Sequence, residues 1–566
     1  MKQIIRNTIA ILNRAERKKG LALIGLNLLI SVLDVGFLAC LLFLVQFYSG
    51  GMPAGRVVML PAWLINTRSL WPLVIFFLLF AVKNLASFLV FRAQSNFRYE
   101  VTLRISRHNL MQYLDGSYDE YVHVGSAVHI ARINLQPAEF SQHVMEGLQQ
   151  SIAEWSMIGL TVTAILLFNA GLFFLLLLLL LPPVVMAAWL TRRQLLAARA
   201  NIANNREMAW QRLDESIGGF VEGNLYDKKD FLMERYHRSQ RLQNKFLSAL
   251  QAMQGAPTRL TEVFAVFGFL ALISISHFSG GGHGTAFVTV GAFLAAAYKI
   301  IPGVARILNL NGQIRAYSYT LNDLVKKKGK NAYVRQDSAV ERIESISFRD
   351  VSFRFGNRYV LRGLNLDIVA GGFVGIGGHS GRGKTTMLNI LLGFLAPESG
   401  EVLFNGMKMN VPERKHCWRR IAYVKQQPFI LNDTLLTNIT MEEEHYDAEK
   451  LNDVMAISGL DAVVREWPLG IGTWISENGK NISGGQRQRI MIARALYKEA
   501  DLYILDEPFS ELDEASEMRM LGYFRQLTLA GKMVILITHN TKSLAYCHTV
   551  ISLGGQEEGR KLPAEI

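Results

Sequence analysis

Long apolar segments dominate the N-terminal part of the chain. Each of them approaches or exceeds the roughly 20 residues that a helix needs to cross the hydrocarbon of a bilayer. The segments are 21–47, 70–91, 151–168, 171–190, 260–278 and 286–301. The pattern predicts an all-α membrane domain of six transmembrane helices, with a tight hairpin at Asn169-Ala170 and a kink at Pro182-Pro183.

The charges between these segments predict their orientation. Connections 92–150 and 191–259 are long and rich in Arg and Lys, whereas 48–69, 169–170 and 279–285 are short and nearly uncharged. Because positively charged connections stay in the cytoplasm, both termini and the two long connections are expected there.

The N-terminus and the long connections carry helical patterns of their own. Near the N-terminus, apolar residues recur at helical spacing, at Ile5, Ile9 and Leu12, and a basic cluster follows them. This pattern predicts an amphipathic helix on the inner membrane surface. Segments 92–114 and 192–215 predict helices that continue past the membrane. Each of the two long connections has an aromatic and acidic patch at its far turn, and taken alone these patches are typical of solvated turns. The patches are 117–121 and 225–231.

Composition agrees with a membrane protein. Half of the 566 residues are hydrophobic, the mean hydropathy is +0.18 and the net charge is +13. In a membrane protein an excess of positive charge typically lies in cytoplasmic loops beside anionic lipid, so a nucleic-acid partner is not predicted. Cys40, Cys417 and Cys547 fit neither a metal pattern nor a disulfide framework. No cleavable signal is expected, because the apolar run after Lys19 is too long for one.

Three ionisable residues fall inside the predicted spans. Asp34 and Lys83 lie near the middle of the first and second spans, and Lys299 lies at a similar depth in the sixth. Such residues usually pair with each other or face a cavity. One hypothesis is a structural Asp34–Lys83 ion pair. The other is that Lys299, with Lys83, lines a cavity and meets an anionic part of a substrate.

A polar stretch, Lys326–Asn331, separates this part from a C-terminal region that alternates strands and helices. Within that region, residues 378–385 fit G-x-x-x-x-G-K-[ST], after an apolar strand at 373–376 and before a helix at 386–392. Such a loop points its N–H groups at phosphates. Lys384 then reaches the β- and γ-phosphates, and the Thr385 hydroxyl holds Mg²⁺.

Two further motifs predict phosphate chemistry. The strand 502–505 ends in Asp506 and Glu507, which are placed to support Mg²⁺ and to polarise a water against the γ-phosphate. In segment 481–489, Ser483 is expected to cap a helix and, with the following glycines, to offer a second phosphate cradle. One nucleotide does not need two cradles in one chain. The second cradle is therefore expected to close over a nucleotide that another copy holds.

These motifs resemble those of ATP-binding-cassette (ABC) transporters, and the whole chain looks like an exporter-type half-transporter. The resemblance implies a transmembrane domain at 1–330, an α/β nucleotide-binding domain at 338–566, and ATP with Mg²⁺ as cofactors. It also implies that the two aromatic and acidic patches are coupling helices that dock on the nucleotide domains.

The resemblance carries roles onto particular residues. Catalysis is implied for Glu507, the switch residue His539 and Lys384, and metal binding for Thr385, Asp506 and Gln426 of the Q-loop. Phe355 stands where the family usually stacks a tyrosine on adenine, and 473–479 resembles an exporter loop with Glu477 as its acid. The implied nucleotide-binding residues are Phe355, Gly378, His379, Ser380, Gly381, Arg382, Gly383, Lys384, Thr385, Thr386, Gln426, Ser483, Gly484, Gly485, Gln486 and Asp513.

Three departures from the family pattern are expected to leave the chemistry in place. Ile482 replaces the usual leucine, Phe355 the usual tyrosine, and Glu511 a common alanine in the D-loop 510–513. Phe355 could instead be a strand core residue, in which case Tyr359 is the alternative stacking residue. Because no ATP-site residue is degenerate, a homodimer is expected, and a heterodimer with a related half-transporter stays open.

The implied function is ATP-driven export or flipping by a dimer in a membrane, expected to be the bacterial inner membrane. Lipids, lipid-linked sugars, peptides and drug-like molecules are all open as substrates. The sixth segment loosely resembles that of lipid-linked oligosaccharide flippases. The alternatives are an importer on the same scaffold and a membrane-anchored regulatory ATPase.

Overall fold

The computed structural model describes residues 1–48, 70–116, 118–168, 208–278, 302–328, 342–378 and 381–553, with the single positions 174, 182, 186 and 300. The chain divides into two compact units. The first comprises Met1–Gly116 and Glu120–Val334, and the second comprises Ser117–Asp119 and Arg335–Ile566.

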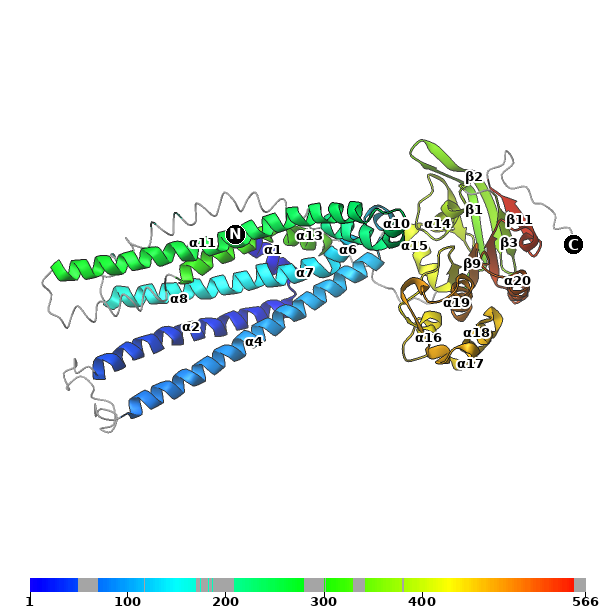
Figure 1. The fold of residues 1–566 in the computed structure, drawn as a ribbon. Helices are drawn as coiled ribbons and strands as arrows, with labels where there is room; N and C mark the ends of the chain where they lie inside the picture. Colours follow the sequence, from blue (N-terminus) through cyan, green and yellow to red (C-terminus); the bar gives the residue numbers. More distant parts are fainter. Residues whose placement is uncertain are drawn as a thin grey trace. The chain divides into compact units, whose positions relative to one another are not determined.

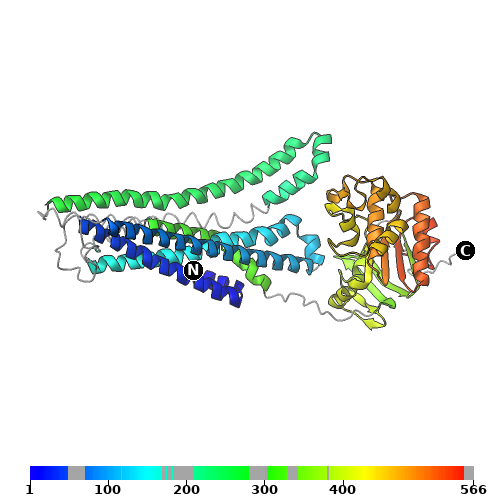
Figure 2. The same ribbon diagram turned by 90° about the horizontal axis from the view of Figure 1, so that it is seen from below.

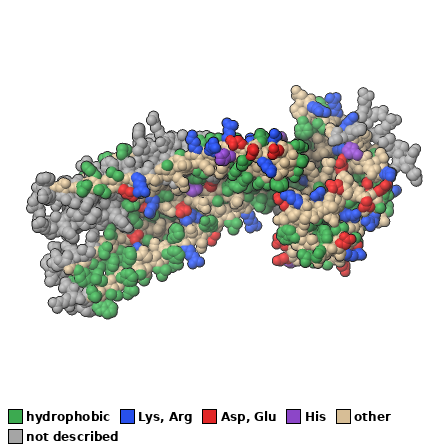
Figure 3. Space-filling model, viewed as in Figure 1, with side chains coloured by type: hydrophobic (Ala, Val, Ile, Leu, Met, Phe, Trp, Pro, Cys, Tyr) green, Lys and Arg blue, Asp and Glu red, His purple; other side chains and the backbone are tan. Residues whose placement is uncertain are grey.

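The first unit is built from long helices (Figure 1). Four of the predicted apolar segments are helical, within α2 (Arg14–Tyr48), α4 (Trp71–Leu114), α8 (Glu146–Phe168) and α11 (Lys229–Phe278). Among the described residues, α2 and α4 contain stretches that are long and apolar enough to cross a membrane. Figure 3 shows hydrophobic side chains gathered over one end of the pair formed by α2 and α4.

Several sequence predictions for this unit lie outside the described residues. These are the helices at 171–190 and 286–301, the hairpin at Asn169-Ala170, the kink at Pro182-Pro183, and Lys299. The predicted amphipathic helix is present as α1 (Lys2–Ile11), which leaves Ile5 and Ile9 exposed.

The helices extend well past the length that a bilayer requires. α4 has 44 residues and α11 has 50, against the roughly 20 that span hydrocarbon. Short helices lie at the two far turns, α5 (Tyr118–His123) and α10 (Phe220–Leu225). The chain then returns toward α8 through α6 (Ser126–Ile130), the π-helix η1 (Ala131–Leu135), α7 (Gln136–Glu139) and the π-helix η2 (Phe140–Met145).

The end of the first unit corrects one prediction. Lys326, Lys327 and Lys328 were expected to belong to a linker, but they form the last turn of α13 (Tyr319–Lys328). α13 packs on α1, and Leu321 and Leu324 are buried in the core of this unit. These apolar contacts extend the helix into the lysine run.

The second unit confirms the predicted α/β class. Its central sheet is parallel, in the order β11-β3-β10-β9-β6, beside a four-stranded antiparallel sheet β2-β1-β4-β5. The parallel strands are β3 (Phe373–Gly377), β6 (Ile421–Val424), β9 (Leu502–Asp506), β10 (Met533–Ile537) and β11 (Thr549–Ser552). The antiparallel strands are β1 (Ser345–Phe355), β2 (Arg358–Val369), β4 (Ser399–Phe404) and β5 (Met407–Lys408).

Helices cover this sheet and follow its strands (Figure 2). All residues of β3, β9 and β10 are buried, which explains why these strands read as continuous apolar runs rather than alternating ones. The helices are α14 (Lys384–Leu391), α15 (Val411–His416), α16 (Leu435–Thr440), α17 (Ala448–Ser458), α18 (Leu460–Glu466), α19 (Gly484–Tyr497), α20 (Glu514–Leu529) and α21 (Thr541–Leu544). A two-stranded ribbon pairs β7 (Asp433–Thr434) with β8 (Trp474–Ile475).

Candidate functional site

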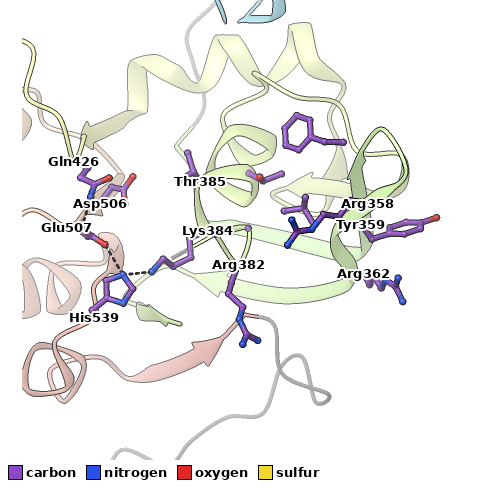
Figure 4. A pocket seen from close by; sticks show the side chains of 15 residues that line it. Arg358, Tyr359, Arg362, Arg382, Lys384, Thr385, Gln426, Asp506, Glu507 and His539 are labelled. Carbon is purple, nitrogen blue, oxygen red and sulfur yellow. Dashed lines mark hydrogen bonds and ion pairs between the residues drawn. The ribbon is translucent and has the colours of Figure 1, made fainter. Parts of the chain in front are cut away.

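Three neighbouring parallel strands end at one edge of the central sheet, and a pocket of ≈ 700 Å³ lies there. The carboxyl ends of such strands form the usual ligand crevice of an open α/β sheet. The phosphate loop follows β3, Asp506 ends β9, and His539 follows β10. The lining residues are Phe355, Arg358, Tyr359, Val360, Arg362, Gly381, Arg382, Gly383, Lys384, Thr385, Thr386, Gln426, Asp506, Glu507 and His539 (Figure 4).

The phosphate loop has the backbone that its glycines predict. Gly378, Gly381 and Gly383 have φ of 131°, 81° and 92°, in the region that favours glycine. Gly383 is the N-cap of α14, so the loop opens directly into a helix N-terminus, where anions bind. His379 and Ser380 lie outside the described residues.

A chain of polar contacts crosses the pocket from the phosphate loop to the Q-loop. Lys384 Nζ lies 2.9 Å from His539 Nε2, and Glu507 Oε1 lies 3.0 Å from the same nitrogen. Gln426 Nε2 donates to Glu507 Oε2 at 2.8 Å. Because one ring nitrogen either accepts or donates, the histidine tautomer decides whether it accepts from Lys384 or donates to Glu507.

Burial shifts the pKa of two charged groups in this pocket. Desolvation lowers the pKa of Lys384, an effect that the nearby Glu507 and Asp506 charges oppose. Desolvation likewise raises the pKa of Asp506, although the Tyr423 hydroxyl donates to it at 3.3 Å. Incompletely neutralised charges of this kind are typical of sites that bind ions or carry out proton chemistry.

Glu507 has an unusual backbone. Its φ is 48°, in the left-handed region that bulky residues seldom adopt, and its N–H donates to Ile537 O at 2.9 Å. Such conformations cost of order 1–3 kcal/mol and cluster at functional sites. The turn directs the Glu507 carboxylate toward Gln426 and His539, whereas Asp506 stays at the end of the strand.

The β1–β2 hairpin forms the aromatic side of the pocket. Phe355 is 59% exposed, so the alternative that it is a strand core residue is wrong. Tyr359 also lines the pocket, and the guanidinium groups of Arg354 and Arg362 lie 5.7 and 4.9 Å from its ring centre. The geometry leaves both rings available for stacking.

Sequence reasoning missed the arginines of this hairpin. Arg358 and Arg362 line the pocket and bring positive charge to a site predicted to hold a triphosphate. The signal was present, because both arginines lie close to Tyr359 at the start of β2, directly after the turn. Their side chains could not be placed without the hairpin register, which pairs Phe355 with Arg358.

Comparison with known proteins accounts for this arrangement. Residues 361–510 match the family described as ABC transporter. A solved structure described as a bacterial Atm1-family ABC exporter with ATP bound has the same fold, with a TM-score of 0.77 over 98% of this chain and 96% of that one, at 17% identity. The chain therefore carries an ABC transporter domain in its C-terminal part. It has the fold of an exporter half-transporter, an integral membrane protein with an ATP-binding domain.

Curated relatives cover less of the chain. An "ATP-dependent lipid A-core flippase" of Cupriavidus pinatubonensis is 29% identical over 350 residues, 60% of this chain and 59% of that protein. A "putative export ATP-binding/permease protein" of Rickettsia prowazekii is 32% identical over 255 residues, 44% of each chain. The matched part thus spans about three fifths of the first relatives' length.

The second cradle of this ABC protein is formed, but it lies away from the pocket. Ser483 is the N-cap of α19, and its hydroxyl accepts from Gln486 N–H in a reciprocal capping box. The capping role predicted for Ser483 is therefore confirmed. In the described part of the chain, neither Ser483–Gln486 nor Asp513 lines the pocket. Asp513 caps α20 and pairs with Arg489 instead.

The residues predicted to hold Mg²⁺ do come together. Thr385, Gln426 and Asp506 all line the pocket, and they offer the oxygen ligands that Mg²⁺ prefers. The predicted Q-loop residue Gln426 also contacts Glu507, so one side chain touches both the metal-binding and the catalytic candidates. Glu477 lies elsewhere, in the short helix η5 (Glu477–Gly479), where it pairs with Lys480.

Proposed function

We propose that this ABC half-transporter is an ATP-driven exporter or flippase that works as a dimer, with both termini cytoplasmic, in a bacterial inner membrane. One observation carries the proposal. The phosphate loop, Asp506, Glu507, Gln426 and His539 converge on one pocket, while the Ser483 cradle lies outside it. Each chain thus holds a nucleotide pocket and, apart from it, the phosphate-binding N-terminus of α19. In the dimer, each copy supplies this helix end to the nucleotide in the pocket of the other copy.

The pocket supports ATP hydrolysis through residues of this chain. Lys384 places a positive charge beside the phosphates, and Thr386 extends the first turn of α14 that faces them. Glu507 is positioned to accept a proton from an attacking water, and His539 contacts both Glu507 and Lys384. Thr385, Gln426 and Asp506 would hold Mg²⁺, which would neutralise phosphate charge.

The dimer is further supported by the region around α10 and the start of α11. In Figure 2 the end of α11 that follows α10 lies apart from α4 and α8. Large apolar side chains there are more than half exposed, which is typical of a surface that docks on another protein. They are Ile217, Phe220, Val221, Leu225, Tyr226, Phe231 and Met233.

The names of the relatives support one substrate class. The first curated relatives are named as lipid A-core flippases, so a lipid amphiphile with an anionic head is the substrate we propose. The test is ATPase activity and transport in reconstituted vesicles, measured with a lipid-linked sugar, a lipid with a phosphorylated head, a peptide and a drug-like cation. Lys384→Ala protein is the matched control.

The expected result is stimulation of ATPase activity and ATP-dependent movement of the phosphorylated lipid out of the nucleotide-accessible leaflet. Movement toward that leaflet would instead show an importer. ATPase activity that no substrate class changes, with no transport, would favour a membrane-anchored regulatory ATPase and refute the proposal.

A further inference from the structure

The loop that carries Glu511 packs directly on the second phosphate cradle. A Cβ atom placed on Gly484 would lie 1.1 Å from Glu511 Oε2, and one placed on Gly485 would lie 2.9 Å from the Glu511 carbonyl oxygen. The space above the first turn of α19 is therefore filled by the carboxylate and the backbone of Glu511. A side chain at position 485 would meet the backbone of this loop, whereas one at position 484 would displace the Glu511 carboxylate.

The contact is held in place by a buried side chain. Gln488 lies one turn further along α19, donates to Ser510 Oγ at 2.6 Å, and accepts from Glu511 N–H at 2.9 Å. It is 4% exposed, so the backbone of Glu511 is fixed against the helix. The Glu511 side chain is less restrained, because it is 52% exposed and its carboxylate lies 3.8 Å from Arg487 Nη2.

The electrostatics of this place favour an anion. Backbone N–H groups and the positive end of the helix dipole meet at the first turn of α19, and Arg487 adds a full charge nearby. A phosphate that arrives from another copy would enter the same space. A carboxylate and a phosphate oxygen cannot both occupy it, and two negative charges there repel each other.

We propose that the Glu511 carboxylate is an internal competitor for the Ser483–Gly485 cradle, which the γ-phosphate of an ATP bound to a second copy must displace before the two copies close. This inference rests on the proposed function, because it assumes that the cradle receives such a phosphate. Glu511 thereby raises the ATP concentration that closure requires, and it acts without touching the pocket of its own chain.

The test measures steady-state ATP hydrolysis by the full-length protein in lipid nanodiscs. Glu511→Gln keeps the shape of the side chain and removes its charge, and Glu511→Ala removes both. Glu514→Gln is the matched control, because Glu514 is a nearby exposed carboxylate that pairs with Lys542 at 2.5 Å. Both Glu511 variants should lower KM for ATP by about two- to fivefold, the scale of one charge at a helix N-terminus. Glu514→Gln should not change KM.

Two further measurements sharpen the test. High ionic strength should shrink the difference between wild type and Glu511→Gln, because salt screens exposed charges. In a Ser483→Arg chain, whose cradle is blocked, Glu511→Gln should leave the binding of a fluorescent ATP analogue unchanged. A change in that binding would mean that Glu511 acts on its own pocket, which would overturn the proposal.

An unchanged or raised KM in Glu511→Gln would also overturn it. If that result came with a lower melting temperature, Glu511 would only stabilise the end of α19. These outcomes differ from a failure of the proposed function. If wild type does not hydrolyse ATP, both proposals fall, whereas an active protein with an unchanged KM refutes only the role of Glu511.

Discussion

Replacing Lys83 by methionine should strongly destabilise the contact between α2 and α4. Lys83 Nζ donates to Asp34 Oδ1 at 2.5 Å, and the two side chains are 7% and 21% exposed. The same Nζ lies 4.7 Å from the ring centre of Phe80. The predicted Asp34–Lys83 ion pair is therefore confirmed, and removing one partner leaves the other charge buried without compensation.

The magnitude follows from that burial. Breaking a buried ion pair by removing one partner costs about 3–5 kcal/mol, whereas removing both partners is often nearly neutral. We therefore expect Lys83→Met and Asp34→Asn each to lose about 3 kcal/mol, and the double variant to lose about 1 kcal/mol. The loss of stability in the double variant should therefore be several kcal/mol smaller than the sum of the two single losses.

The chain supplies a matched control between the same two helices. Lys19 Nζ and Glu100 Oε2 also join α2 to α4, at 2.6 Å, but their side chains are 51% and 62% exposed. Because exposed pairs contribute about 0–1 kcal/mol, Lys19→Met and Glu100→Gln should change stability little. Burial, rather than ion-pair distance, should account for the difference between the two pairs.

The assay is unfolding of the full-length protein in mixed micelles by a denaturing detergent, with ATP binding as an independent check of folding. Losses that simply add in the double variant would refute the reasoning, because they would show that neither charge compensates the other. Losses of equal size at the exposed control pair would refute it as well.

Three further predictions concern the nucleotide site. Glu507→Gln should retain ATP binding but lose hydrolysis by about 10²–10⁴-fold, since the glutamine accepts no proton; hydrolysis within about tenfold of wild type would contradict that role. Phe355→Ala should weaken ATP binding by about 1–3 kcal/mol if Phe355 stacks on the base, and calorimetry of Tyr359→Ala provides the comparison; a loss in Tyr359→Ala alone would assign stacking to Tyr359. Ser483→Arg should abolish hydrolysis while each chain still binds ATP, and co-expression with Lys384→Ala chains should restore one composite site. Mixed dimers, isolated with two affinity tags, that remain inactive would argue against sites shared between copies.

The nucleotide site is largely a product of local sequence. The phosphate loop needs glycines at 378, 381 and 383, because the backbone there has positive φ, and such a requirement is visible in a linear motif. The strand before the loop and the helix after it follow from buried apolar runs and helix periodicity. Local motifs therefore predicted Lys384, Asp506 and Glu507, and the family resemblance added His539, although these residues come from separate elements.

Tertiary structure decided which residues join that site and which do not. The hairpin register brings Arg358 and Arg362 to the pocket, and no linear pattern specifies side-chain direction across a turn. The apolar packing of α13 likewise extends a helix into a lysine run whose composition resembles a linker.

The same holds for the charges within the first unit and for Glu511. Sequence placed Asp34 and Lys83 at similar depth, but only the packing of α2 on α4 determined that they meet. From the family resemblance, Glu511 was expected only to replace a common alanine and to leave the chemistry in place. The Glu511 carboxylate lies at the N-terminus of α19 because Gln488 fixes the loop over Gly484. No sequence pattern predicts this contact, because the two segments are well separated along the chain.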